Sequence, residues 1–327
     1  ALISQMVLIC CSLALAVLSL TRGPLPLLYA ILAIIGAARA FNNPAEGALT
    51  PQMVPPEYYF SAITWSSSVW QFSAIIGPAI GGLIIGLTNT AAFVYIANAA
   101  AGSVLVGALL LIRSKQTEYG HNGETPLQSI RAGWSFLRRT QIILASITLD
   151  MFAVLFGGAT FLLPVFAKDI LHVDAAGLGV LRAAPSVGAL LMAVFIARRP
   201  PFRRAGRTLL LAVAGFGVAT IVFGLSTSFW LSLAMLFALG ALDNISVLVR
   251  HTLVMTHTPD QMRGRVGSVN SLFIGASNEL GGFESGVAAA ALGPVGAVVV
   301  GGIGTLLVVG MIARIAPQLR NLGALGK

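Results

Sequence analysis

Ten long apolar stretches constrain the fold of this chain more than any other feature. A helix needs ~20 mostly apolar residues to cross the ~30 Å hydrocarbon core of a bilayer. The stretches that meet this requirement run over residues 3–21, 25–54, 60–87, 91–112, 142–166, 176–197, 208–226, 229–256, 265–290 and 293–313. They are too long and too uniformly apolar for the alternating strands of a membrane barrel. We therefore predict an all-α membrane protein, a polytopic helical bundle.

The composition excludes several classes of soluble protein. Of the 327 residues, 57% are hydrophobic and 9% are charged, against ~45–50% and ~25% in average soluble domains. A soluble chain this apolar could not form a polar surface, so an ordinary soluble enzyme, a nucleic-acid-binding domain and a disordered chain are excluded. The two cysteines, Cys10 and Cys11, are adjacent, and the four histidines do not pair at ligand spacing. We expect no catalytic site, no metal and no cofactor.

The basic residues predict an orientation, because short loops rich in Lys and Arg stay in the cytoplasm. If the ten spans alternate, 15 of the 20 basic residues fall on one side and only Arg22 and Lys168 on the other. The 15 are Arg113, Lys115, Arg131, Arg138, Arg139, Arg198, Arg199, Arg203, Arg204, Arg207, Arg263, Arg265, Arg314, Arg320 and Lys327. Both ends of the chain are therefore expected in the cytoplasm.

The longest polar segment predicts the division into domains. Residues 114–141 are polar at first and then amphipathic, with Ile130, Trp134 and Leu137 spaced four and three apart. This spacing is typical of a short interfacial helix, although an ordinary linker between two bundles fits equally well. We predict an N-terminal bundle over 1–113, a cytoplasmic linker over 114–141 and a C-terminal six-helix bundle over 142–327.

An internal repeat accounts for the number of spans. An offset of 203 residues superimposes the first four spans on the last four, and Pro56-Glu57 then falls on Pro259-Asp260. Two spans precede the repeated part in the second half but not in the first. The parent protein is therefore expected to have twelve spans, with ten present here and two missing from the beginning. Parallel six-helix repeats place a substrate site between the halves near the midplane.

Several motifs resemble one family of transporters. The twelve expected spans and the long central loop resemble the major facilitator superfamily. The runs Ala38–Ala45, Thr258–Val266 and Ser277–Gly286 are similar to its bacterial exporter branch, which includes the enterobactin exporter and macrolide-efflux relatives. The resemblance implies a secondary active, proton-driven exporter of a drug-like or siderophore-like small molecule in the bacterial inner membrane, acting as a monomer by alternating access.

A glycine- and proline-rich core favours export over import. Gly77, Pro78, Gly81 and Gly82 lie within one span and resemble the antiporter motif of the family's fifth helix, although Ser73 and Ala74 stand where an upstream glycine is expected. Glycines at this spacing also let helices pack closely in membrane proteins of every class. Both interpretations, an antiporter motif and helix packing, stay open.

Ionisable residues within the spans are candidates for the transport pathway. Such a residue costs ~2.5–3.5 kcal/mol on insertion scales, so it usually faces a cavity or a partner. The spans contain Arg39, Glu46, Asp150, Arg182, Asp243, Arg250, Glu279 and Glu284. Arg39 and Asp243 lie near mid-span and are one residue apart under the repeat, which places Arg39 on position 242. The resemblance places them with Asp150 on helices four, ten and seven, around the central cavity.

We predict that Arg39, Asp150 and Asp243 line the substrate and proton pathway, with Asp243 or Asp150 carrying the proton. The alternative for Arg39 and Asp243 is a fixed ion pair that braces the two halves.

Three other predictions concern supporting residues. Glu279 and Glu284 are expected to form structural bonds to neighbouring helices, because the family's eleventh helix supports the cavity. Asp260, Arg263 and Arg265 are candidates for a cytoplasmic gate closed by ion pairs.

A non-transporting membrane sensor or assembly protein on a transporter frame, or an importer of the same fold, remains the alternative function.

Overall fold

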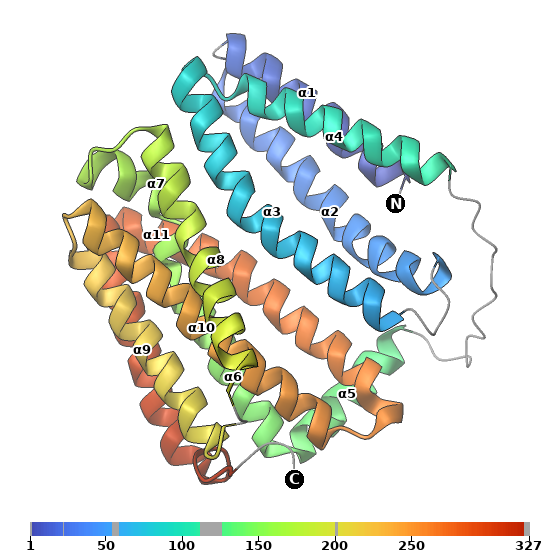
Figure 1. Cartoon of the computed structure of the whole chain (residues 1–327), viewed down its shortest axis with the longest axis vertical. Helices are drawn as coiled ribbons and strands as arrows, with labels where there is room; N and C mark the ends of the chain where they lie inside the picture. Colours follow the sequence, from blue (N-terminus) through green and yellow to red (C-terminus); the bar gives the residue numbers. More distant parts are fainter. Residues whose placement is uncertain (1, 22, 54–58, 112–125, 200–201, 324–327) are drawn as a thin grey trace. The chain divides into compact units, whose positions relative to one another are not determined.

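The computed structural model describes the backbone at residues 2–21, 23–53, 59–111, 126–199 and 202–323 (Figure 1). Side chains are described at the same positions except 40–53, 59–64, 66–68, 70–71, 126–130, 158, 260–261 and 263. These ranges contain helices and no β-strand, as the predicted all-α fold class requires. The chain divides into two compact units, Ala1–Gly120 and His121–Lys327.

Unit 1 contains four helices, α1 (Leu2–Thr21), α2 (Leu25–Met53), α3 (Tyr59–Thr88) and α4 (Ala92–Leu111). Helix α1 packs against α2 and α4, and its Cys11 and Leu15 form a small core with Ile31. The Asn98 amide of α4 donates a 2.8 Å hydrogen bond to the Ser12 hydroxyl of α1. A polar bond between two apolar helices gives their packing a defined register.

The described part of unit 2 contains five longer helices, α6 and α8 to α11, together with the amphipathic α5 and several short helical turns. Its elements are α5 (Pro126–Arg139), α6 (Gln141–Phe156), the 3₁₀ turn η2 (Gly158–Thr160), α7 (Leu163–Val165), the π-helical turn η3 (Phe166–Ile170), α8 (Ala175–Ala197), α9 (Ala205–Leu225), α10 (Phe229–His257), α11 (Asp260–Ile315) and α12 (Pro317–Arg320). Helix α10 packs against α8 and α9, while α11 packs against α6 and α9.

The described residues do not settle the number of membrane-spanning helices. Six helices in the described part are long and apolar enough to cross a bilayer, or seven if α5 and α6 count as one bent span. Helix α11 counts once, although its 56 residues include Gly293, whose φ of 74° interrupts the helical conformation, and Pro294. The predicted number of ten spans is not confirmed and stays a prediction.

The helix bounds follow the predicted repeat. Adding 203 to the bounds of α1 gives 205–224, and α9 is Ala205–Leu225; adding 203 to those of α2 gives 228–256, and α10 is Phe229–His257. Between α3 and α4, Asn89 has a positive φ of 54°, and its equivalent position, 292, is adjacent to Gly293. The interruption of α11 is therefore the counterpart of the turn between α3 and α4.

Helix α5 turns sharply away from α6, with a bend of 108° between them. Its apolar side packs on the other helices of unit 2. Leu137 is fully buried, and the Trp134 ring stacks on Phe273 of α11. Arg138 and Arg139 on the other side are exposed. The segment is thus an amphipathic helix, and its predicted location at the membrane interface stays a prediction.

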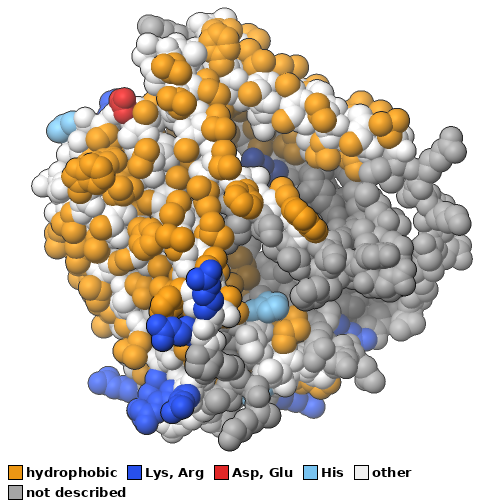
Figure 2. Space-filling view, viewed as in Figure 1, with side chains coloured by type: hydrophobic (Ala, Val, Ile, Leu, Met, Phe, Trp, Pro, Cys, Tyr) orange, Lys and Arg blue, Asp and Glu red, His pale blue; other side chains and the backbone are white. Residues whose placement is uncertain are grey.

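The surface has the composition expected of a protein surrounded by lipid. Hydrophobic side chains cover most of the described surface on the face shown in Figure 2, and Lys and Arg side chains gather towards its lower edge. The junction between α8 and α9, at the lower end of unit 2 in Figure 1, carries exposed arginines. They are Arg198, Arg199, Arg203, Arg204 and Arg207.

Unit 2 contains two separate apolar clusters with polar residues between them. Along α10, Val249 and Leu253 belong to one cluster, whereas Leu236 and Leu239 belong to the other. Asp243 lies between these two pairs. Along α9, Leu209 and Val213 belong to the first cluster and Ala219 and Phe223 to the second. The middle of the unit is thus a layer between the two clusters, in which Asp243 interrupts the apolar packing along α10.

Helices α8 and α10 approach each other closely at two glycines. A Cβ atom on Gly188 of α8 would overlap the carbonyl oxygen of Phe237, and one on Gly240 of α10 would overlap the carbonyl oxygen of Pro185. Small residues of this kind let membrane helices pack backbone to backbone.

We expect Gly188→Ala to lower the melting temperature of the purified protein in detergent, because the added methyl group must separate α8 from α10, and overpacking of this kind costs roughly 1–3 kcal/mol. Gly310→Ala on α11 is the matched control, since its Cβ would meet no atom within 4 Å. Equal melting temperatures for the two variants would contradict the close packing of α8 and α10.

Candidate functional site

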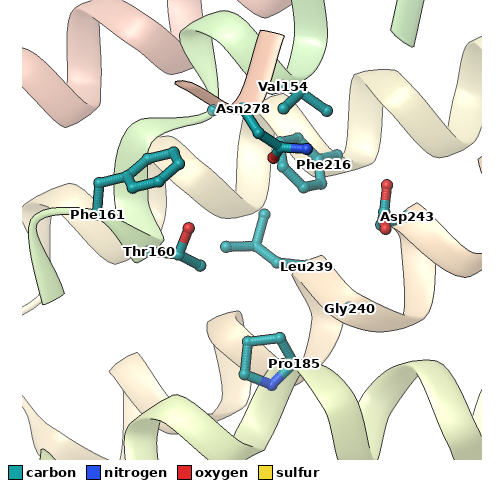
Figure 3. Close-up of a pocket in the computed structure, with 10 residues that line it drawn as sticks. Val154, Thr160, Phe161, Pro185, Phe216, Leu239, Gly240, Asp243 and Asn278 are labelled. Carbon is teal, nitrogen blue, oxygen red and sulfur yellow. The ribbon is translucent and has the colours of Figure 1, made fainter. Parts of the chain in front are cut away.

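The central feature of unit 2 is a carboxylate at the middle of α10. Asp243 is 14 residues from Phe229 and 14 from His257, or ~21 Å from either end of the helix at ~1.5 Å per residue. It lines a cavity of about 170 Å³ within unit 2 (Figure 3). The described lining residues are Val154, Gly157, Thr160, Phe161, Pro185, Phe216, Leu239, Gly240, Asp243 and Asn278.

A break in the first long helix of the unit opens this cavity. Helix α6 ends at Phe156, Gly157 forms its C-cap, and the 3₁₀ turn η2 follows. Thr160 and Phe161 enter the cavity from this irregular segment. Non-helical backbone at membrane depth is tolerated only where it is buried in protein or lines a cavity. We predicted one uninterrupted span over 142–166, so the break is a correction, and the adjacent pair Gly157-Gly158 is the signal that was overlooked.

Asn278 of α11 contributes the second polar group. Its side-chain nitrogen donates a 2.9 Å hydrogen bond to the carbonyl oxygen of Ile274, one turn earlier. The reverse orientation of the amide would bring two oxygens together, so this bond fixes the orientation of the amide and uses one of its two N–H groups. The amide oxygen and the second N–H group remain available to the cavity. Sequence analysis included Asn278 only within the run Ser277–Gly286 and gave it no role of its own, because it considered only the ionisable residues within the spans.

Asp243 itself makes no hydrogen bond or ion pair with any residue that the structure describes. In Figure 3 its carboxylate, the Asn278 amide and the Thr160 hydroxyl surround the same space from three different segments of unit 2. The apolar wall between them is formed by Leu239 and Phe216.

Asp150 has a different environment. Its carboxylate forms an ion pair with Arg250 of α10, and the two residues are 6% and 5% exposed. Arg250 lies seven residues after Asp243, so the two side chains share one face of α10 about 10 Å apart along its axis. Asp150 is not among the described residues that line the cavity. Sequence analysis named Arg250 only among the ionisable residues within the spans, and its pairing with Asp150 was not predicted.

Arg39 belongs to unit 1. It lines a cavity of about 490 Å³ there, together with the polar side chains of Gln5, Ser12, Tyr95 and Asn98. Asp150 and Asp243 therefore lie in one unit and Arg39 in the other. The predicted common pathway and the alternative Arg39–Asp243 pair concern both units, and they stay predictions.

The glycine- and proline-rich motif lies in α3. A Cβ on Gly77 would meet no described atom within 4 Å, and one on Gly81 would approach only Val94, at 4.0 Å. Close packing within the described part of unit 1 therefore does not account for Gly77 or Gly81, and the role of the motif, with Pro78 and Gly82, stays a prediction.

The remaining predicted residues lie on α11. Glu279 is exposed and Glu284 is half-buried. The Arg265 guanidinium donates to the Met262 sulfur at 3.6 Å, while the side chains of Asp260 and Arg263 lie outside the described residues. The predicted structural and gating roles stay predictions.

Nowhere in the described ranges do three or more His, Cys, Asp or Glu side chains gather closely enough to hold a metal ion.

Comparisons with known proteins identify the family. The model of the Major Facilitator Superfamily matches residues 2–282, and the chain belongs to that family. The Enterobactin exporter EntS of Escherichia coli (strain K12) is 27% identical over 274 residues, which cover 84% of this chain and 65% of that relative. The protein of the same name from Shigella boydii serotype 18 (strain CDC 3083-94 / BS512) is 28% identical over the same shares.

These findings confirm the predicted resemblance to the bacterial exporter branch and the helical bundle of the major facilitator type. The matched region spans just under two thirds of the length of these curated relatives.

Removal of one partner of the Asp150–Arg250 pair should be strongly destabilising, because it leaves an uncompensated buried charge. We expect Arg250→Met to lower the free energy of unfolding by about 3–5 kcal/mol, and the double variant Asp150→Leu/Arg250→Met to recover most of that loss. Thermal unfolding of the single and double variants in detergent measures the coupling. A double variant no more stable than Arg250→Met would contradict the pairing.

Proposed function

We propose that this chain forms a secondary active transporter that exports a small molecule across the bacterial inner membrane in exchange for protons. Membership of the Major Facilitator Superfamily and the exporter named among its relatives support a transporter and the direction of export. The observation that carries the proposal is Asp243, a carboxylate at the middle of α10 and next to a cavity, which has no ionic partner among the residues whose side chains are described.

The two buried acids of unit 2 support different roles. A charged side chain in the hydrocarbon region is unfavourable by ~2.5–3.5 kcal/mol on insertion scales, and such residues mark ion or proton pathways unless they are paired. Asp150 is compensated by Arg250, so its charge has a structural partner. Asp243 has none among the described residues. We therefore assign the proton to Asp243 and a positioning role to Asp150.

A cycle of proton exchange follows from this assignment. When Asp243 is protonated, unit 2 carries no uncompensated charge in its polar layer. When the carboxylate is ionised, it needs water or a ligand with hydrogen-bond donors in the cavity. Proton movement and ligand transport are coupled because either the proton or the ligand, but not both, compensates the charge of the Asp243 carboxylate. Arg39, in the cavity of unit 1, is proposed to contribute to substrate binding.

Export rather than import is supported by two features. The motif formed by Gly77, Pro78, Gly81 and Gly82 resembles that of the family's antiporters, and close helix packing within the described part of unit 1 does not account for Gly77. The relatives named above are exporters.

Asp260, Arg263 and Arg265 are proposed to close the cytoplasmic side. The transported compound is drug-like or siderophore-like in size.

We expect Asp243→Asn to abolish transport driven by a pH gradient while the protein remains folded in the membrane, because an amide cannot carry the proton. The measurement is the accumulation of a panel of drug-like and siderophore-like compounds in inverted vesicles, with and without a pH gradient, using the complete coding sequence. Glu279→Gln, the neutralisation of an acid that does not line the cavity, should retain transport. Full gradient-driven transport by Asp243→Asn would remove Asp243 from the mechanism.

The basic end of unit 2 is expected to face the cytoplasm. In a background with Cys10 and Cys11 replaced by Ala, a cysteine at Arg203 should react with a membrane-impermeant maleimide only in inverted vesicles. A cysteine at Thr227, in the loop at the other end of α9, should react only from outside intact cells. The opposite labelling pattern would contradict the proposed orientation.

A further inference from the structure

The described residues around the Asp243 cavity present more hydrogen-bond acceptors than donors. An ionised carboxylate only accepts hydrogen bonds, and a threonine hydroxyl both donates and accepts. One N–H group of the Asn278 amide is bonded to the Ile274 carbonyl, which leaves one N–H group and the amide oxygen, with its two lone pairs. None of the described lining residues is basic. A ligand that satisfies this set must supply donors or positive charge.

The broken helix adds to the same polarity. The C-terminal end of a helix carries a partial negative charge, and α6 ends at this cavity, although the Val154 and Gly157 carbonyls themselves accept backbone hydrogen bonds from Gly157 and Ala159. Val154 and Gly157, which lie in the last turn of α6 and at its cap, line the cavity. The helix end therefore favours a cation at the same place as the Asp243 carboxylate.

The walls of the cavity are apolar and partly aromatic. Phe161 and Phe216 present rings on two sides, and Leu239 and Pro185 complete the wall. A cation within ~6 Å of an aromatic ring is attracted to its face, most strongly when the cation carries little water. A small inorganic ion has no apolar surface to pack against these walls. An alkylated ammonium group matches both the negative charge of Asp243 and the apolar walls.

The size of the cavity limits the part of a ligand that fits. Its volume of about 170 Å³ equals that of roughly five to six water molecules in the liquid, at ~30 Å³ each. Drug-sized ligands occupy pockets of ~300–1,000 Å³. The cavity therefore accommodates a head group, and the body of a larger molecule must extend out of it.

We propose that the cavity lined by Asp243, Asn278, Thr160 and Phe161 binds the ammonium head group of the transported compound, so that the substrate class is the organic cations. This inference rests on the proposed transport function and specifies its substrate. The Asp243 carboxylate supplies the counter-charge, the Asn278 and Thr160 oxygens accept N–H or polarised C–H groups, and the Phe161 and Phe216 rings cover the alkyl groups.

The test compares choline with its uncharged carbon isostere, 3,3-dimethyl-1-butanol, in calorimetric titrations of the full chain purified in detergent. We expect choline to bind at least about tenfold more tightly than the isostere, a difference of ~1.4 kcal/mol. Asp243→Asn should weaken choline binding by a similar factor. Asn278→Asp, which adds a second carboxylate, should strengthen it, and Glu279→Gln on the next residue of α11 should leave it unchanged.

Several outcomes would overturn the inference. The first is equal affinity for choline and the isostere. The second is that neither Asp243→Asn nor Asn278→Asp changes the affinity for choline. The third is that sodium chloride displaces choline at equal concentration. If gradient-driven transport of some compound persists while choline does not bind, the substrate class is wrong and the transport function stands. If choline binds in an Asp243-dependent manner but no compound is transported, the site stands and the transport function is wrong.

Discussion

A carboxylate in the middle of a membrane-embedded bundle must be paired, hydrated or protonated, and this constraint governs the arrangement of unit 2. Asp150 satisfies it through Arg250, at the edge of one apolar cluster. Asp243 lies between the two apolar clusters and lines a cavity, and within the described ranges no cationic side chain pairs with it. The same physical requirement thus produces a fixed pair at one position and an open, titratable site about 10 Å away along α10.

Breaks in helices create that open site. Helix α6 ends at Gly157 in the middle of the unit, and the polar backbone and the Thr160 hydroxyl that follow require a cavity or buried partners. On the other side, Gly188 and Gly240 bring α8 against α10 so closely that no side chain fits between their backbones. Helices α8 and α10 thus pack closely, whereas α6 is interrupted. The cavity is lined by residues from both regions, Pro185 and Gly240 on one side and Gly157 and Thr160 on the other.

Hydropathy predicted the helical segments well, because a lipid-exposed helix must be apolar along its whole length. The repeat, detected from hydropathy alone, matches the bounds of α9 and α10 within about one residue. Side-chain partners were harder to predict. The pairing of Asp150 with Arg250 depends on the rotation of two helices about their axes, and the role of Asn278 depends on which of its atoms the backbone occupies. Neither property is encoded in a hydropathy profile.

The central claim is that export consumes the proton gradient through Asp243. The most direct test follows proton movement itself, with a fluorescent pH-gradient probe in inverted vesicles that carry a preformed gradient. Addition of a transported compound should dissipate part of the gradient in the wild-type protein and leave it unchanged in Asp243→Asn. Accumulation of a compound by the wild-type protein without any proton movement would contradict the account.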